Sequence, residues 1–296
     1  MSDLFKGIID MHVHGSPSVA VRRNTPDFMR DMGKLGYRAF VLKDHYYPSA
    51  GVCNILNQWL EKETGVTACG SLILNNAVGG LNMYAVDMAV NMGTKVVSFP
   101  TISAKCHLDA MASLSFAGSG KGMVTSENDS PLTVLDPGGK LKKEAIAIID
   151  YLADKHPDVC LWTGHLDVEE IDRVAEYAFK KGIKKLYANH PYWMIEAPLK
   201  HIREWADAGM YIELNMGVLG PWSDGTLPTD PEVVLEIIRT FPLKQLVLVT
   251  DFGQMANPMP PEGMKSYLEY LMQHGVTEEQ IDAMGKRNPA YLLSLD

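Results

Sequence analysis

The sequence predicts one α/β domain spanning residues 1–296, a (β/α)8 TIM barrel with an insertion after the fourth strand and extra C-terminal helices. Eight short segments rich in apolar and β-branched residues alternate with helical segments, which is typical of a parallel sheet with helical crossovers. Several of these strands are continuous apolar runs, as expected when both sheet faces are covered. The length suits one such barrel. A doubly wound open sheet is the alternative, but no glycine fingerprint follows the first strand.

The predicted elements follow one another with short connections, and glycines close many of the helices. Pro26 stands at the first position of the first helix, where a missing N–H is tolerated. The strands are expected at 8–14, 37–43, 66–75, 95–100, 159–163, 185–188, 210–214 and 246–250. The helices are expected at 26–36, 50–63, 80–91, 142–155, 168–181, 198–208, 231–241, 261–274 and 278–285.

The alternation is interrupted after the fourth strand by residues 104–140, a stretch rich in Gly, Ser, Thr and Asp. A loop of this length in a compact domain is usually functional or disordered, so we expect a lid-like insertion over the mouth of a site. Its segment 118–122 superficially resembles a phosphate-binding loop. It lacks the Ser or Thr after Lys121 and the preceding strand that such a loop requires.

Composition excludes several classes of protein. A formal net charge of -9 argues against a nucleic-acid partner, and no apolar run is long enough for a membrane span. The N-terminus lacks the features of a signal peptide. The four cysteines, Cys53, Cys69, Cys106 and Cys160, form no C-x-x-C pair, which favours a reduced, cytoplasmic setting. We therefore expect a cytoplasmic protein.

The first strand carries two histidines, His12 and His14, two positions apart. Because side chains alternate along a strand, Asp10, His12 and His14 are expected on one face, with Met11 and Val13 on the other. Two imidazoles at this spacing can hold one metal ion from a rigid backbone. Taken alone, the pair could equally be polar surface residues.

The other histidines decide between these interpretations. His12, His14, His45, His165 and His190 all fall at the C-terminal ends of predicted strands, and those ends converge on the face where barrel active sites are built. A sixth histidine, His107, follows the fourth strand by a few residues. The remaining three, His156, His201 and His274, lie on or beside predicted helices. The arrangement predicts a metal site; neutral imidazoles suit Zn2+, and Mn2+ or Fe2+ remain alternatives.

Asp251 ends the eighth strand, where a carboxylate can bind metal and accept the proton of an activated water. Its alternative role is to form a turn, since Phe252 and Gly253 follow. With the histidines around it, we interpret Asp251 as a catalytic residue.

This ordered set of residues resembles the amidohydrolase superfamily. The pair on strand one, the single histidines ending strands five and six and the aspartate ending strand eight match its pattern, and the tail 287–293 contains the Asn-Pro-Ala sequence common in that group. The resemblance covers essentially the whole chain. It implies a metal-activated water that attacks an amide, ester or phosphoester centre. It also implies His12, His14, His165, His190 and Asp251 as metal ligands, with Asp251 as the general base.

This sequence departs from the amidohydrolase pattern at strand four, where family members that bind two metal ions often have a carboxylated Lys or a Glu. The segment 99–103 offers neither. Lys43 and His45 share a face of strand two, so Lys43 is either a carboxylated ligand, a contact for a substrate carboxylate or a salt-bridge residue. The pair Asp44–His45 also resembles polymerase-and-histidinol-phosphatase barrels, in which a strand-two histidine binds metal. The resemblance thus leaves open one or two ions.

Three further residues, Lys105, His107 and Glu213, are candidates to reach the site. The pocket is expected to have aromatic walls and amide groups. Its candidate lining residues are Tyr46, Tyr47, Asn75, Asn76, Tyr192, Trp193, Asn215, Met216 and Trp222. The apolar loop 255–261 either covers this pocket or contacts a second subunit in a homo-oligomer.

The leading functional prediction is a metal-dependent hydrolase that cleaves an amide, lactone or related ester bond of a small molecule. A phosphoesterase, resembling phosphotriesterases, ranks second because no cluster of Arg or Lys is evident for a phosphate. A metal-dependent decarboxylase on the same barrel ranks third. A non-enzymatic binding protein is the rival from another class, and it would have no reason to place Asp251 beside a metal with an open position.

Overall fold

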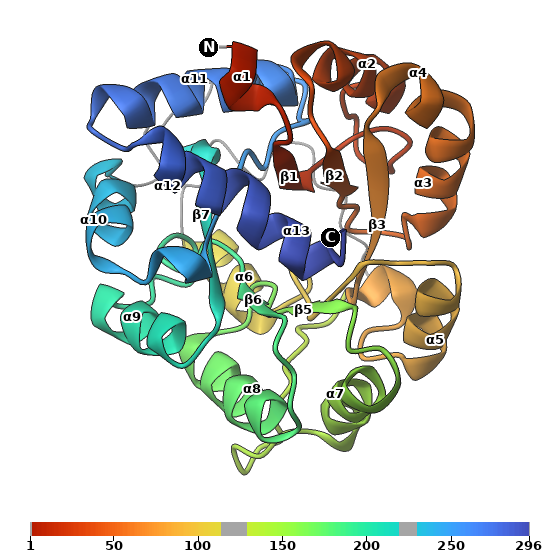
Figure 1. Cartoon of the computed structure of the whole chain (residues 1–296). Helices are drawn as coiled ribbons and strands as arrows, with labels where there is room; N and C mark the ends of the chain where they lie inside the picture. Colours follow the sequence, from red (N-terminus) through yellow and green to blue (C-terminus); the bar gives the residue numbers. More distant parts are fainter. Residues whose placement is uncertain (1, 114–128, 219–229, 296) are drawn as a thin grey trace.

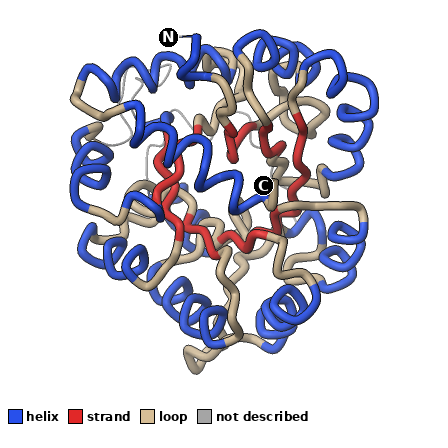
Figure 2. Tube along the Cα trace, in the orientation of Figure 1, coloured by secondary structure: helices blue, strands red, loops and turns tan. Residues whose placement is uncertain are grey.

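A computed structural model describes residues 2–113, 129–218 and 230–295 of the chain. Eight parallel strands lie side by side in their order along the chain, surrounded by helices (Figures 1 and 2). The strands are β1 (Ile9–Val13), β2 (Ala39–Leu42), β3 (Thr67–Ile73), β4 (Val96–Ser98), β5 (Cys160–Trp162), β6 (Leu186–Ala188), β7 (Tyr211–Asn215) and β8 (Leu246–Val249). Each falls within one predicted strand or extends it by a single residue.

The first and last strands meet, which closes the sheet into a barrel. Val13 forms a parallel bridge with Phe252, the His14 N–H donates to the Phe252 carbonyl at 2.7 Å, and the Asp251 N–H donates to the His12 carbonyl at 2.8 Å. The predicted (β/α)8 barrel is therefore confirmed, and the doubly wound alternative is wrong. The same bonds place the candidate ligands of β1 beside Asp251.

Helices α2 to α5 and α7 to α11 form the outer layer, whereas α6 lies inside this ring, behind the strands in the view of Figure 1. Their bounds are α2 (Thr25–Leu35), α3 (Ala50–Leu56), α4 (Lys62–Thr64), α5 (Met83–Asn91), α6 (Lys105–Ser113), α7 (Lys143–Lys155), α8 (Val168–Lys180), α9 (Leu199–Asp207), α10 (Glu232–Thr240) and α11 (Pro260–Gln273), with the short α1 (Ser2–Phe5) at the N-terminus. Among the described residues, none of these helices combines the length and apolar character needed to span a bilayer.

The core has two layers. Ile9, Met11, Val41, Trp162 and Tyr187 belong to the cluster that fills the barrel, and residues such as Phe40, Leu161 and Leu248 pack outward against the helices. The Trp162 and Tyr187 rings stack with centroids 5.0 Å apart. This buried aromatic pair lies next to the first strand's histidines, since the Trp162 ring is 5.8 Å from the ring of His12.

The C-terminal segment was not fully predicted. The expected helix 278–285 is seen as α12 (Glu278–Asp282), but the chain continues through a π-helical turn at Ala283–Arg287 into α13 (Asn288–Leu293). Leu292 and Leu293 pack in the inner cluster, and the Asn288 amide donates to the carbonyls of Leu243 and Leu246 beside the start of β8. Helix α13 thus closes the end of the barrel opposite the candidate site. Figure 1 shows it crossing in front of the strands.

The insertion 104–140 is not simply a loop, since α6 occupies Lys105–Ser113. The part of the insertion that leads back to the barrel is held by isolated β-bridges between Ala104 and Leu132 and between Leu135 and Leu141. The segment 118–122 and Trp222 lie outside the described residues.

Candidate metal centre

The backbone of β1 departs from the predicted alternation. A register shift lies between Asp10 and Val13, so that Ile9 and Met11 pack inside the barrel while Val13 packs in the outer layer. The predicted grouping of Asp10 with the histidines, opposite Met11 and Val13, is wrong in detail. The Asp10 carboxylate instead accepts bonds from the Thr250 N–H, the Thr250 hydroxyl and the His12 N–H, and burial raises the pKa of Asp10 to about 7. Asp10 therefore fastens β1 to β8.

The two β1 histidines present the same nitrogen to Asp251. His12 Nδ1 donates to Glu213 Oε1 at 3.0 Å and Oε2 at 3.1 Å, and His14 Nδ1 donates to the Lys43 carbonyl at 2.9 Å. These acceptors hold the Nδ1–H tautomer. Each Nε2 is left 3.0 Å from Asp251 Oδ1. Metal-binding histidines are typically oriented in this way, with one nitrogen bonded to a carboxylate or carbonyl and the other facing the ion.

Asp251 and His190 both sit on strained backbone after their strands, with φ of 58° and 25°. Such left-handed conformations are uncommon for residues other than glycine and persist only where the surroundings enforce them. Gly253 helps to hold Asp251 in this conformation because it allows the chain to pass close to β1. A Cβ at this position, where φ is 130°, would lie 1.7 Å from the His14 carbonyl oxygen. The chain after β8 can approach β1 this closely only with glycine at that position.

His190 brings a third imidazole to the same point. Its Nε2 lies 4.0 Å from Asp251 Oδ2 and 3.9 Å from Glu213 Oε1, and its ring lies 5.9 Å from that of His12. His12, His190 and Asp251 offer ligand atoms that all lie within 4.8 Å of one another. With His14 on the other side of Asp251, four of the five predicted ligands converge.

The fifth predicted ligand, His165, lies beside this group. Its ring is 5.1 Å from that of His190, and its Nδ1 is 3.0 Å from Nδ1 of His107. His107 Nδ1 also lies 2.8 Å from Sδ of Met194. Within the described ranges, His165 Nε2 is buried and has no hydrogen-bond partner.

Strand two contributes Lys43 and His45, both buried. Lys43 Nζ lies 2.9 Å from His12 Nε2, so it contacts an imidazole rather than the carboxylate of a simple salt bridge. Burial lowers the pKa of Lys43, although Asp251 and Glu213 act in the opposite direction. The His45 ring lies 5.0 Å from that of His14, and its Nδ1 is 2.9 Å from the Thr101 hydroxyl.

The electrostatics of the centre favour a cation. Burial alone would raise the pKa of Asp251, but His12 and His14 hold it well below its usual range; the pKa of Glu213 is likewise lowered by His12 despite burial. Burial lowers the pKa of His14 to about 3, which keeps its ring neutral. The pKa of His12, by contrast, is raised to about 9: burial acts to lower it, but Asp251 and Glu213 outweigh burial. Two ionised carboxylates around this imidazole form a site that attracts positive charge, and a metal ion would compete there with the His12 proton.

Sequence reasoning missed the residues that support Glu213. Its Oε2 accepts bonds from the Tyr187 hydroxyl and the Asn189 amide, each at 2.9 Å. Asn215 supports Asp251 in the same way, since its amide donates to Oδ2 at 2.9 Å. The sequence signal available for Tyr187 and Asn189 was their position, because they lie within or just after β6, which His190 also follows. Lys105 does not reach the centre: it is exposed and pairs with Asp109 on α6.

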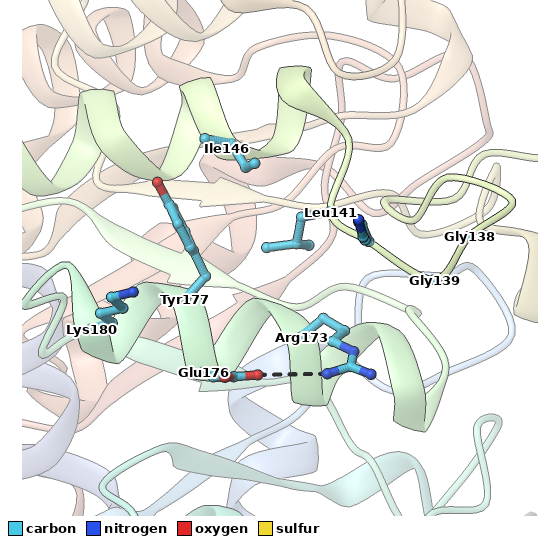
Figure 3. A pocket seen from close by; sticks show the side chains of 9 residues that line it. Gly138, Gly139, Leu141, Ile146, Arg173, Glu176, Tyr177 and Lys180 are labelled. Atoms are coloured by element: carbon cyan, nitrogen blue, oxygen red, sulfur yellow. Dashed lines mark ion pairs between the residues drawn. The ribbon is translucent and has the colours of Figure 1, made fainter.

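A separate cavity of about 560 Å3 lies outside the barrel, between α7, α8 and the turn that contains Gly138 (Figure 3). Its lining includes Ile146, Tyr177 and an Arg173–Glu176 ion pair 3.7 Å apart. None of the predicted ligands lines it. This cavity is therefore separate from the histidine cluster.

The fold and the cluster together define the class: a closed (β/α)8 barrel in which side chains that could hold a metal ion converge at the C-terminal ends of the strands. Residues 7–213 match the model of a family of unknown function, DUF6282, and the chain belongs to that family. No curated protein sequence matches it.

Three solved structures illustrate the structural likeness. An amidohydrolase from Pseudomonas aeruginosa shares 11% identity, with 99% of this chain and 97% of that chain covered and a TM-score of 0.64. A lactonase template engineered for organophosphate hydrolysis shares 16% identity over 97% and 94%, with a TM-score of 0.54. A dihydroorotase shares 15% identity over 98% and 70%, with a TM-score of 0.57. At these identities the likeness establishes the shared fold, as expected from the amidohydrolase resemblance.

Proposed function

We propose that this protein is a metal-dependent hydrolase of small molecules, with His12, His14, His190 and Asp251 as ligands of a divalent ion and His165 beside them. The observation that carries the proposal is the orientation of the β1 imidazoles. Glu213 and the Lys43 carbonyl occupy the Nδ1 atoms, and both Nε2 atoms face one oxygen of Asp251. Imidazole nitrogens and a carboxylate oxygen suit Zn2+ best, which is the ion we propose.

When bound, the ion would polarise the scissile carbonyl and lower the pKa of a water molecule from about 15.7 towards 7. The chain's own residues supply the rest. Asp251 is held ionised by His12 and His14, and Asn215 fixes its Oδ2. These contacts support Asp251 as the group that accepts the proton of the attacking water and delivers it to the leaving group. Glu213 is a positioning residue that orients His12.

An amide, lactone or related ester is the proposed substrate bond. The solved structures named as an amidohydrolase, a lactonase template and a dihydroorotase support this class, because they share the barrel. Phosphoester hydrolysis is supported less well. Lys43 is the cationic side chain in direct contact with the cluster among the described residues, whereas a phosphate site usually gathers several Arg or Lys donors.

The insertion is part of the proposal. Its helix α6 carries His107 against His165, which supports a lid-like role for residues 104–140 within a single domain. The four free cysteines support a reducing, cytoplasmic setting. Exposed apolar side chains on α3 and α5 support a homo-oligomer.

The test is a substrate screen with Zn2+-loaded protein against lactones, cyclic amides, simple esters and phosphoesters, run in parallel with Asp251→Asn. We expect turnover of a lactone, amide or ester by the wild type and its loss in the variant. Absence of turnover across the panel with metal bound, or equal turnover by the variant, would contradict the proposal.

A further inference from the structure

We propose that the substrate carries a carboxylate beside its scissile bond, and that the guanidinium of Arg22 at the mouth of the barrel binds this group. The inference rests on the proposed function, because Arg22 would select among substrates of the same metal centre. Arg22 belongs to the loop that joins β1 to α2, shortly after the two histidines of β1.

The backbone of this loop places Arg22 beside the chain that follows Asp251. Arg22 forms an antiparallel bridge with Gln254, and the N–H of Arg23 donates to the Gly253 carbonyl at 2.8 Å. The Gln254 side chain in turn donates to the Asp251 carbonyl at 2.9 Å. The loop after β1 is therefore paired with the loop after β8, at the end of the barrel where the candidate metal ligands lie.

The same loop is also tied to itself and to the segment after β2. The Ser16 N–H donates to the Arg23 carbonyl at 2.9 Å, and the Tyr47 hydroxyl donates to the Pro17 carbonyl at 2.6 Å. Arg22 thus lies on a backbone that is held by the segments after β1, β2 and β8. A cation on such a preorganised loop binds a ligand with a smaller loss of conformational entropy than one on a free loop.

The Arg22 side chain is partly buried among charged and polar groups. Burial lowers its pKa, whereas Tyr46, Asp44 and Asp251 act to raise it, so its guanidinium lies near all three. The Asp44 carboxylate is already occupied in part, since it accepts from the Tyr46 N–H at 2.8 Å. Within the described ranges, the Arg22 side chain forms no ion pair and no hydrogen bond. Burying an unpaired cation costs free energy, and an anion supplied by the substrate would offset that cost.

The neighbouring arginine has a different role. Arg23 donates to the Met255 carbonyl at 3.1 Å and to the Asn257 carbonyl at 2.6 Å. Its guanidinium therefore holds the loop after β8 against the loop after β1. Of these two consecutive arginines, one fixes the backbone and the other, Arg22, is left to bind a ligand.

A carboxylate fits this position better than a phosphate. One guanidinium presents a planar fork that matches the two oxygens of a carboxylate, whereas a phosphate site usually gathers several cations. Lys43 was the candidate contact for a substrate carboxylate in the sequence. It is instead buried, with Nζ 2.9 Å from His12 Nε2, while Arg22 is only partly buried at the mouth.

Equilibrium binding tests the proposal without any turnover. Zinc-loaded full-length protein is titrated by calorimetry with levulinate and with acetonylacetone, a neutral diketone in which a methyl ketone replaces the carboxylate. We expect Arg22→Gln to raise the Kd of levulinate by about 10–100-fold and to leave that of acetonylacetone unchanged, because only the charge-assisted bonds are lost. Arg22→Lys, which keeps the charge and loses the fork, should have an intermediate effect.

Arg30→Gln is the matched control, because it removes an exposed arginine of α2 that pairs with Glu63. This variant should bind both compounds as the wild type does. A wild type that binds levulinate no more tightly than acetonylacetone would overturn the proposal. An unchanged Kd for levulinate in Arg22→Gln would also overturn it and would assign the carboxylate to the metal ion or to Lys43.

Kinetics give a second readout. The substrates are paraconate, which is γ-butyrolactone with a carboxylate on the ring, and its carboxamide. Arg22→Gln should raise KM for paraconate with kcat nearly unchanged and should leave the carboxamide unaffected, since Arg22 binds ground state and transition state alike. An equal fall in kcat on both lactones would reject the role in specificity.

This inference and the proposed function fail separately. Levulinate binding that depends on Arg22, without hydrolysis of any substrate, would reject the hydrolase and keep the carboxylate site. Lactone hydrolysis with the same kcat/KM in the wild type and Arg22→Gln would reject the carboxylate site and keep the hydrolase.

Discussion

Asp251 is the residue on which the proposed chemistry depends. It lies on left-handed backbone after β8, one oxygen faces both β1 imidazoles, and the other accepts from Asn215. Aspartate tolerates this conformation better than most residues, so the left-handed backbone costs less free energy here than it would with most other side chains.

Asp251→Asn should therefore keep the fold and lose catalysis. An amide cannot accept the proton of the attacking water, so we expect kcat to fall by about 10²–10⁴-fold with the thermal melting temperature nearly unchanged. Steady-state kinetics on the best substrate and a melting curve measure both. Full turnover by a variant that still binds zinc would rule out the acid–base role.

Glu213 acts on the ion through His12. It is fully buried, holds Nδ1 of His12 with both oxygens and is itself held by Tyr187 and Asn189. Glu213→Gln replaces a charged acceptor with a neutral one that can also donate, which no longer specifies the Nδ1–H tautomer.

We expect Glu213→Gln to weaken Zn2+ binding by about 10–100-fold, measured by competition with a chelator. Tyr187→Phe, which removes one bond to Glu213 without touching the imidazole, should weaken it less. A purely structural role for Glu213 would lower stability and leave zinc affinity unchanged.

At the scale of elements, Glu170 fastens the insertion to the barrel. This buried residue of α8 accepts from the Thr133 hydroxyl, from the Val134 N–H at 2.8 Å and from the Asp167 N–H at 3.1 Å. One carboxylate thus joins the returning part of the insertion to the first turn of α8.

Stability should depend on the titration of Glu170. Burial raises its pKa above the ordinary 4.5, so the folded chain binds this proton more readily than the unfolded chain. Stability from this group is therefore fully present below pH 4.5 and falls as the pH rises through the folded pKa. Urea unfolding should show the wild type losing stability relative to Glu170→Gln as the pH is raised to neutrality. A difference that is constant with pH would refute this.

Elements also show what the sequence could and could not predict. All eight strands were predicted from the apolar runs and from the glycines and prolines at helix ends, because strand positions depend mainly on the local sequence pattern. Helix α13 was missed because Pro289 suggests a helix end, whereas a π-helical turn and the two bonds of Asn288 carry the helix past it. The irregularity of β1 depends on Asp10 bonding to Thr250, 240 residues away, and no local pattern encodes such a pair.

The same distinction holds for the site. Predicted ligands lie at strand ends, and topology alone brings strand ends together. Glu213 remained ambiguous because its role follows from a contact with His12 across 201 residues of sequence. The pairing of His107 with Met194 depends on how α6 folds back over the strands, which the composition of the insertion did not reveal.

At the scale of the whole molecule, several large apolar side chains are exposed. They include Ile55, Trp59 (72% exposed), Tyr84 (86% exposed), Met88 and Met92, and the Asn54 amide donates to the Met92 carbonyl just after α5. Exposed apolar side chains that adjoin one another commonly mark an interface.

We expect Trp59→Lys to convert the homo-oligomer to a monomer without loss of fold, as measured by sedimentation velocity. Met272→Lys, at a half-exposed position on α11, is the control and should leave the assembly intact. A wild-type protein that sediments as a monomer at high concentration would contradict the proposed oligomer.

Binding of a metal ion by His12, His14, His190 and Asp251 can be observed in an anomalous difference map. Crystals of protein loaded with Zn2+ should show a peak, recorded at the zinc edge, between Asp251 and the Nε2 atoms of these histidines. Lys43 Nζ should then have moved from its contact 2.9 Å from His12 Nε2. Zinc-loaded crystals that show no peak at this position, with Lys43 still in contact with His12, would rule out this metal site.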